Sequence, residues 1–184
     1  MPQHDRAVCG ACLRNPPQYD ATFSAFRYDY PLDRLVQTLK FHGQLALARF
    51  LGERIAVAVA GRSGATVPLL IPMPLHPGRL AERGFNQAVE LGRHVARISG
   101  GRLETAAARR IRDTASQTTL PVDGREKNVR GAFRCDADLA GRSVAVIDDV
   151  MTTGATLNEV ARVLKRAGAA RVENWVVART VLDD

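Results

Sequence analysis

The chain has no long apolar run, and this absence sets the first limits on what it is. None of its hydrophobic stretches approaches the ~18 consecutive apolar residues of a membrane-spanning helix. Its first residues also lack the charged-then-apolar order of a secretory signal peptide. The 184 residues are 46% hydrophobic and 24% charged, which is typical of one folded domain with a short appendage. We therefore expect a cytoplasmic protein with a substantial buried core.

Aromatic residues and lysines are both scarce. Aromatic side chains make up 5% of the chain, few for a surface on which nucleic-acid bases stack. Only Lys40, Lys127 and Lys165 are lysines, although 26 basic and 19 acidic residues give a net charge of +7. The positive charge is thus nearly all arginine, whose planar guanidinium binds two phosphate oxygens at once. A genome-wide bias toward arginine codons explains the same composition equally well, because the arginines are scattered along the chain.

Cysteines number three, which is too few for two zinc knuckles. Cys9 and Cys12 have the Cys-x-x-C spacing that lets two thiolates reach one metal ion, but no second pair follows. Two interpretations stay open: a residual half-site with free thiols, or a zinc site completed by His4, by a second copy of the chain or by upstream residues. A redox motif is disfavoured because it normally follows a strand at the start of a helix. We expect Cys135 to be a small buried side chain.

Strands that alternate with helices predict an α/β fold, in which helices flank a mostly parallel twisted sheet. We expect a polar, proline-broken arm at residues 1–18 and a single domain at residues 19–184. Hydrophobic periodicity predicts strands at residues 26–30, 67–72, 102–111, 143–148 and 171–180. It predicts helices at residues 31–43, 44–60, 86–101 and 155–168. The polar segment 111–130 is long for a connection in a compact domain, so we expect it to be functional or mobile.

The stretch VIDDVMTTGAT, residues 146–156, has the features of a ribose-phosphate site. Asp148 and Asp149 follow an apolar strand, at the edge where open α/β sheets bind ligands. The next turn enters a helix whose first N–H groups and dipole favour an anion. Small or hydroxyl-bearing residues line that turn: Thr152, Thr153, Gly154, Ala155 and Thr156. Neighbouring ribose hydroxyls can donate to the carboxylates while the turn binds the 5′-phosphate; a tight loop with an acidic helix cap would need only one of these features.

Other phosphate-binding and catalytic motifs are absent from the sequence. No Gly-Lys-Ser/Thr follows the acid pair, so the turn is no P-loop, and the G-x-G-x-x-G spacing of a dinucleotide-binding fold is also missing. We find no Ser-His-Asp or Cys-His arrangement that would support nucleophilic catalysis. The acid pair and its turn are therefore the strongest candidates for the site.

At these residues the chain resembles the type I phosphoribosyltransferases, which bind phosphoribosyl pyrophosphate (PRPP). The rest of the chain, from about residue 19 to residue 180, is similar to the ComF competence-protein family. Three segments carry this second resemblance: YPLDRLVQTLKFHG, IPMPLHPGRLAERGFNQA and RDTASQTTLPVDGREKNVRGAF. Members of that family usually have an N-terminal zinc ribbon of two Cys-x-x-C knuckles, of which only Cys9 and Cys12 match here.

The resemblance implies roles for individual residues. Asp148 and Asp149 would bind the ribose hydroxyls and residues 152–156 the 5′-phosphate, with Arg112 as a further catalytic candidate. Residues 72–79 match the pyrophosphate loop and residues 111–130 the flexible lid. The candidates in these two segments and the adjoining helix are Arg79, Arg83, Asn86, Gln87, Arg112, Gln117 and Arg125. Solvated surface positions or pairs with carboxylates are the alternative for the arginines.

The implied reaction is a pentosyl-group transfer of nucleotide metabolism, in which a nitrogen nucleophile displaces pyrophosphate from the anomeric carbon. Mg²⁺ would accompany the diphosphate, because it prefers phosphate oxygens and water to a protein cage. The protein would stabilise the departing diphosphate and exclude water. The acceptor stays undefined, because no hood over a nucleobase can be identified in the sequence.

A second function remains open beside this glycosyltransferase activity. The ComF resemblance implies a non-catalytic PRPP-binding protein that handles single-stranded DNA in natural transformation, together with the DNA-uptake machinery. A candidate surface for the strand combines aromatic and basic residues: Phe26, Tyr28, Tyr30 and Phe41 with Arg27, Arg34 and Lys40. The alternative is that these aromatic side chains belong to the domain's own core. An enzymatically silent regulator that binds nucleotides is a third interpretation.

Overall fold

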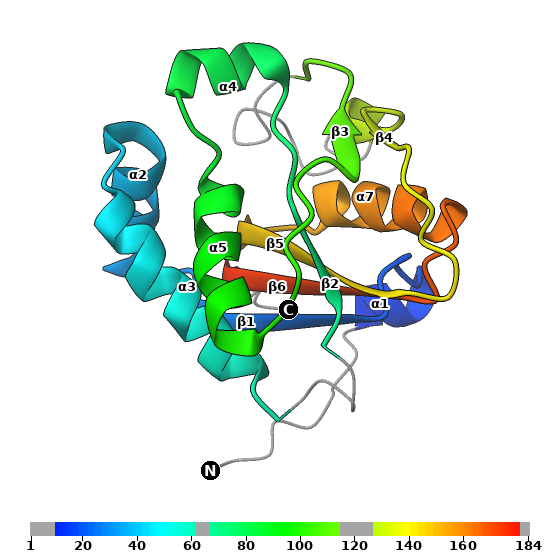
Figure 1. Ribbon diagram of the computed structural model, residues 1–184, viewed down its shortest axis with the longest axis horizontal. Helices are drawn as coiled ribbons and strands as arrows, with labels where there is room; N and C mark the ends of the chain where they lie inside the picture. Colours follow the sequence, from blue (N-terminus) through cyan, green and yellow to red (C-terminus); the bar gives the residue numbers. More distant parts are fainter. Residues whose placement is uncertain (1–9, 62–66, 115–126, 181–184) are drawn as a thin grey trace.

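The computed structural model describes residues 10–61, 67–114 and 127–180, and a four-stranded parallel sheet forms its centre (Figure 1). The strand order is β1-β6-β5-β2. These strands are β1 (Ala21–Arg27), β6 (Arg171–Arg179), β5 (Ser143–Met151) and β2 (Leu69–Pro72). Because all neighbours are parallel, the carboxyl ends of the strands meet at one edge of the sheet. The predicted fold class is confirmed.

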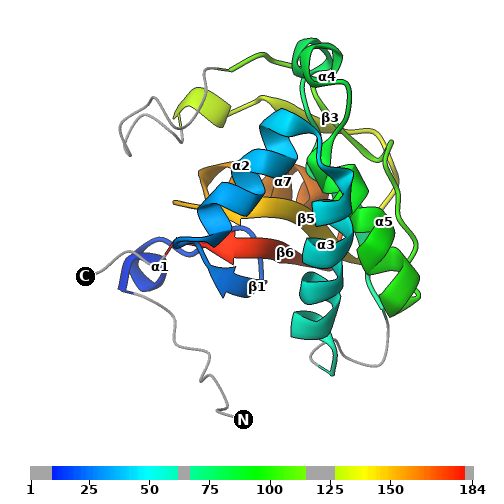
Figure 2. The same cartoon turned by 90° about the vertical axis from the view of Figure 1, so that its left-hand side faces the viewer.

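Two apolar clusters hold helices against opposite faces of the sheet (Figures 1 and 2). One cluster joins the sheet to α2 (Leu32–His42), α3 (Leu45–Val59) and α5 (Gln87–Ser99), and the other joins it to α7 (Ala155–Arg166). Strand β5 contributes residues to both clusters, because alternate residues of a strand point to opposite faces of the sheet. Ala145 and Ile147 contact the first cluster, whereas Val144 and Val146 contact the second.

Smaller elements complete the described part of the chain. They are α1 (Gly10–Arg14), α4 (Pro77–Arg83) and an antiparallel ribbon of β3 (Ala108–Arg110) and β4 (Phe133–Cys135). Phe133 of the ribbon is buried in the same cluster as α7. Within residues 10–61, 67–114 and 127–180, no helix combines the length and apolar content that a bilayer crossing needs.

The predicted order of the main elements is confirmed, but three local predictions are wrong. The first strand is β1 rather than residues 26–30, because its residues 21–26 are half-buried without an inside–outside alternation that a pattern could detect. Of residues 102–111, only β3 forms a ladder, apart from a bridge between Leu103 and Leu70. Residues 77–83 form a helix where the sequence favours a loop. Pro77 occupies its first turn, and the His76 ring accepts a hydrogen bond from the Gly78 N–H at 3.3 Å.

Candidate functional site

The acid pair lies within the carboxyl-terminal part of strand β5, not beyond the strand as the sequence suggested. The reason is that the pairing of β5 with β6 continues to Met151. Asp148 is 8% exposed and Asp149 is 3% exposed. The carboxylate of Asp148 accepts a hydrogen bond from the Asp149 N–H at 2.9 Å, and that of Asp149 accepts one from the Val150 N–H at 2.8 Å. These local bonds fix the orientation of both side chains at the edge where the parallel strands end.

A buried ion pair connects this acid pair to helix α2. The Lys40 Nζ atom lies 2.6 Å from Asp149 Oδ2, and the two side chains are 26% and 4% exposed. Burial lowers the pKa of Lys40, but the facing Asp149 and the nearby Asp148 raise it more, so the lysine stays charged. Burial, together with the negative charge of Asp149, raises the pKa of Asp148 well above its ordinary value. One ammonium thus balances two adjacent carboxylates.

The turn after β5 is built for close backbone approach. Gly154 has a φ of +80°, which disfavours any side chain, and an added Cβ would lie 2.7 Å from the Met151 Cε atom. Gly154, which precedes α7, has no side chain to cap the helix, and the Thr153 hydroxyl accepts a hydrogen bond from the Ala155 N–H at 3.5 Å. The start of α7 has the anion-binding character of a helix N-terminus. Ala155 is buried, Thr153 and Thr156 are half-buried, and Thr152 is exposed. The predicted cradle is therefore adjacent to the acid pair.

The helix-start residues that follow the predicted pyrophosphate loop are engaged in internal hydrogen bonds. Asn86 caps α5 by accepting a hydrogen bond from the Ala88 N–H at 2.9 Å, and its amide donates to the Met73 carbonyl at 3.0 Å. Arg83 donates to the buried Gln87 side chain at 2.6 Å. Asn86 and Gln87 therefore hold the segment in place.

Two arginines form contacts with the two ends of the predicted lid, residues 111–130. Arg79 donates to the Thr114 carbonyl at 2.8 Å and lies 3.6 Å from the Asp113 carboxylate. Arg112 donates to the Asn128 carbonyl at 3.0 Å and is otherwise exposed. Residues Gln117 and Arg125 lie outside the described residues, so their predicted roles stay predictions.

Arg110 is a site residue that the sequence analysis missed. Its guanidinium donates to the Thr114 hydroxyl and stacks over the Phe133 ring at 5.4 Å. Burial and the charge of Arg79 lower its pKa, and the charge of Asp148 acts in the opposite direction, which shows that these groups share one electrostatic environment. Its Nε atom is buried and has no hydrogen-bond partner among the described residues. No sequence pattern signals this role, since Arg110 is one of many arginines and lies in a short strand.

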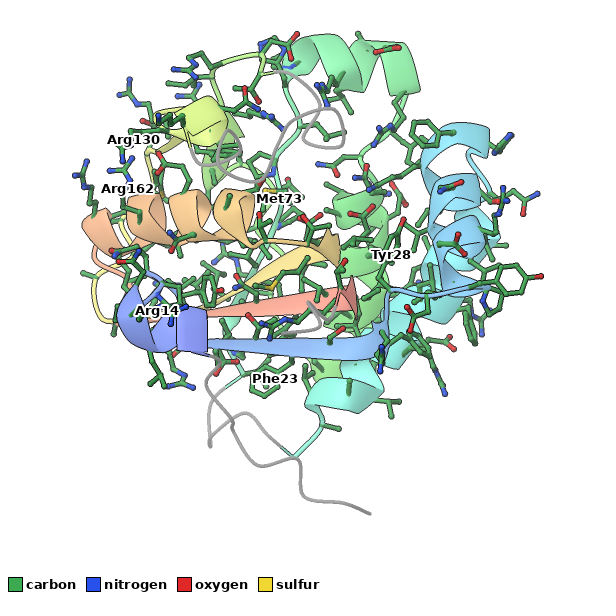
Figure 3. All side chains as sticks on the ribbon, turned by 180° about the vertical axis from the view of Figure 1, so that it is seen from behind. Arg14, Phe23, Tyr28, Met73, Arg130 and Arg162 are labelled. Carbon is green, nitrogen blue, oxygen red and sulfur yellow. The ribbon has the colours of Figure 1, made fainter. Side chains whose placement is uncertain are left out.

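The predicted aromatic surface for a DNA strand does not form as one patch. Phe26 and Tyr28 (the latter labelled in Figure 3) are half-buried against the α2–α3–α5 cluster, whereas Tyr30 is 82% and Phe41 69% exposed. Lys40, expected beside them at the surface, points instead to Asp149. The alternative, in which aromatic side chains belong to the core, therefore applies to Phe26 and Tyr28.

The cysteines give no metal centre in the described part of the chain. Cys9 lies outside the described residues, while Cys12 is half-buried in α1. Within residues 10–61, 67–114 and 127–180, no group of three His, Cys, Asp or Glu side chains could hold an ion. Cys135 is half-buried rather than buried, and burial raises the pKa of its thiol. Zinc at the N-terminal arm stays a prediction.

Comparisons with known proteins agree with this geometry. The phosphoribosyl transferase domain model matches residues 85–180, just over half of the chain. DNA utilization protein YhgH of Salmonella typhi is 36% identical over 185 residues, covering 97% of this chain and 80% of that protein. Competence protein F of Haemophilus influenzae is 32% identical over 178 residues, covering 93% of this chain and 78% of that protein.

A comparison with solved structures gives matches at low sequence identity. TT1426 from Thermus thermophilus has a TM-score of 0.46 and 19% identity, covering 74% of this chain and 85% of that chain. The parallel sheet and the domain match together define a type I phosphoribosyltransferase domain. Within that class, the chain belongs to the ComF family.

Proposed function

We propose that the chain binds PRPP at the carboxyl end of β5 and transfers its phosphoribosyl group to a nitrogen nucleophile with release of pyrophosphate. The observation that carries this proposal is the continuous unit of strand, acid pair, glycine turn and helix N-terminus at residues 143–166. Carboxylates accept hydrogen bonds from ribose hydroxyls, and the start of α7 supplies N–H groups to the 5′-phosphate. One local segment thus supplies acceptors for the ribose hydroxyls and donors for the 5′-phosphate.

The charge around Asp148 suits the departing diphosphate. Arg110 is close enough to Arg79, Asp113 and Asp148 for their charges to affect its pKa, and Arg112 lies within the predicted lid. Negative charge grows on the pyrophosphate as its bond to the anomeric carbon breaks, and these guanidinium groups would stabilise it. The buried lysine–aspartate pair would in turn keep a carboxylate ionised for the ribose hydroxyls.

Mg²⁺ fits this site without a dedicated protein cage. When bound, the ion would neutralise part of the charge on the diphosphate, whose oxygens and water would be its ligands. The described residues supply arginines that would contact the remaining phosphate oxygens. The chain's own task is to orient the sugar and to surround the leaving group.

Calorimetric titration with PRPP and Mg²⁺ tests the pocket. We expect the parent protein to bind and Asp148→Asn to lose at least about tenfold in affinity, as removal of one charged acceptor costs about 1.5–3 kcal/mol. Asp136→Asn is the matched control, because that carboxylate pairs only with the exposed Arg109 and Arg134 in the described structure. No binding by the parent protein would refute the proposal. Pyrophosphate release, screened with a panel of nucleobases, then separates transfer from binding alone.

A second candidate function is the handling of single-stranded DNA, with PRPP bound but not turned over. Two observations favour it. Relatives at 36% and 32% identity bear the names DNA utilization protein and Competence protein F. The net charge of +7 also agrees with a polyanionic partner. PRPP binding without pyrophosphate release for any acceptor in the panel, together with DNA binding, would favour this function over the first.

A further inference from the structure

A second concave site lies on the outer side of α7, away from the acid pair. It has a volume of about 760 Å³, and its walls come from α7, from residues 129–131 and from Gln18. This volume falls within the ~300–1,000 Å³ that is usual for ligand sites. Neither Asp148 nor Asp149 lines it, but Ala155 of the predicted phosphate cradle does. The groove therefore begins beside the proposed PRPP site and extends along α7 away from the acid pair.

Basic side chains dominate this groove. Lys165 and Arg166 follow Arg162 by three and four residues on α7, so both lie on the same face of the helix as Arg162. Arg130 lies on the facing wall, and Figure 3 shows it above Arg162 at the same side of the molecule. Cations thus line both sides of one channel.

The single acid of the groove is already neutralised. Glu159 accepts two hydrogen bonds from the Arg162 guanidinium, at 2.8 and 2.6 Å, and one from the Gly131 N–H at 2.7 Å. Burial would raise the pKa of Glu159, but these contacts lower it below its ordinary value. Lys165 is paired with Asp20 at 2.7 Å. Among the described residues, Arg130 and Arg166 form no ion pair and remain available to an anion.

We propose that this groove binds the phosphate backbone of single-stranded nucleic acid. The proposal rests on the second candidate function and gives it a location. Charge complementarity selects a polyanion, and a concave channel with cations on both walls suits one flexible strand better than the convex surface of a duplex. None of the described residues that line the groove is aromatic, so bases would not stack there and binding would be independent of sequence.

Fluorescence anisotropy of a labelled oligothymidylate, measured over a series of salt concentrations, tests the groove. The double variant Arg130→Gln/Arg166→Gln removes the two available cations. The matched control Arg54→Gln/Arg97→Gln removes the same charge from exposed positions outside the groove. Each phosphate contact contributes about −0.7 to the slope of log affinity against log salt, so the groove variant should lower the slope by about 1.4 and the control should leave it unchanged.

The outcomes separate the groove from the function on which it rests. If the parent protein does not bind the oligonucleotide, both the groove and the DNA-handling function are refuted. If both double variants lose affinity and slope equally, DNA binding stands but the groove is refuted. Competition by a duplex of the same length as effectively as by the single strand would also overturn the proposal. Far-UV circular dichroism and thermal melting of each variant verify that it is folded.

Discussion

Replacement of Lys40 by methionine removes the cation that balances two buried, adjacent carboxylates, with a stem of similar length left in place. Breaking a buried ion pair by removal of one partner costs about 3–5 kcal/mol. Because the Lys40 side chain is 26% exposed, we expect a loss near the lower end, about 3 kcal/mol of unfolding free energy at neutral pH. The loss arises mainly from the unpaired charge on Asp149, whose side chain is only 4% exposed.

The pH dependence of this loss distinguishes charge from packing. Without Lys40, whose charge lowers the pKa of Asp148, the pKa of Asp148 in the folded chain should rise further, whereas aspartates in the unfolded chain titrate near about 3.9. A carboxyl whose pKa is higher in the folded chain than in the unfolded chain binds a proton on folding. The variant should therefore lose stability as the pH rises from the unfolded-chain pKa toward the folded-chain pKa. The deficit relative to the parent should therefore grow as the pH rises above about 3.9 and shrink as the pH falls toward that value.

Urea denaturation of the parent, Lys40→Met and Lys40→Arg over this pH range provides the measurement. Lys40→Arg keeps the charge and should recover much of the stability, which a purely steric role of the lysine does not predict. A Lys40→Met deficit that is the same at every pH would show that the lysine acts through packing alone. In that case the electrostatic link between α2 and β5 would have to be abandoned.

Three further substitutions test other parts of the fold. Gly154→Ala should destabilise the protein by at least about 1–2 kcal/mol, because its φ is +80° and the new Cβ would approach Met151 Cε at 2.7 Å; an unchanged melting temperature would contradict this. Asn86→Ala should cost at least about 1 kcal/mol, measured by urea denaturation, because it removes the cap of α5 and the hydrogen bond to the Met73 carbonyl. Asn86→Asp should keep the cap but lose the second bond, so it should recover only part of this stability. Leu164→Ala, at a fully buried position between α7 and the sheet, should cost about 2–5 kcal/mol. An equal effect of Ile98→Ala, which is 52% exposed, would refute the assigned core.

Local patterns were enough to predict the elements that carry the proposed site. The strand at β5 and the helix at α7 are marked by an apolar run, a glycine turn and a helical repeat, all within residues 143–168. Helix α4 escaped prediction because prolines at positions 72, 74 and 77 resemble a loop, although proline is well tolerated in the first turn of a helix. Strand β1 escaped because half-burial on both faces leaves no two-residue period.

Contacts between distant segments could not be predicted in the same way. Lys40 and Asp149 are far apart in the sequence, and nothing in the pattern of α2 distinguishes an inward lysine from a solvated one. The burial of Arg110 could not be predicted either, since it follows from the packing of β3 and β4 over α7 rather than from its neighbours in the chain. The composition shows that arginines are numerous, but it cannot predict which of them lie next to acidic side chains.

The alternation of β5 assigns different tasks to the two aspartates. Neighbouring residues of a strand point to opposite faces, which places Asp149 on the side of α2, where Lys40 meets it, and Asp148 on the side of α7 and its glycine turn. A ligand that contacts both carboxylates must therefore lie across the edge of the sheet rather than on one of its faces. Asp148 shares its face with the predicted phosphate cradle, whereas Asp149 holds helix α2 through Lys40 and also accepts a hydrogen bond from the Val150 N–H. Because the two acids are adjacent, the carboxyl end of β5 can contact a ligand and hold helix α2 at the same time.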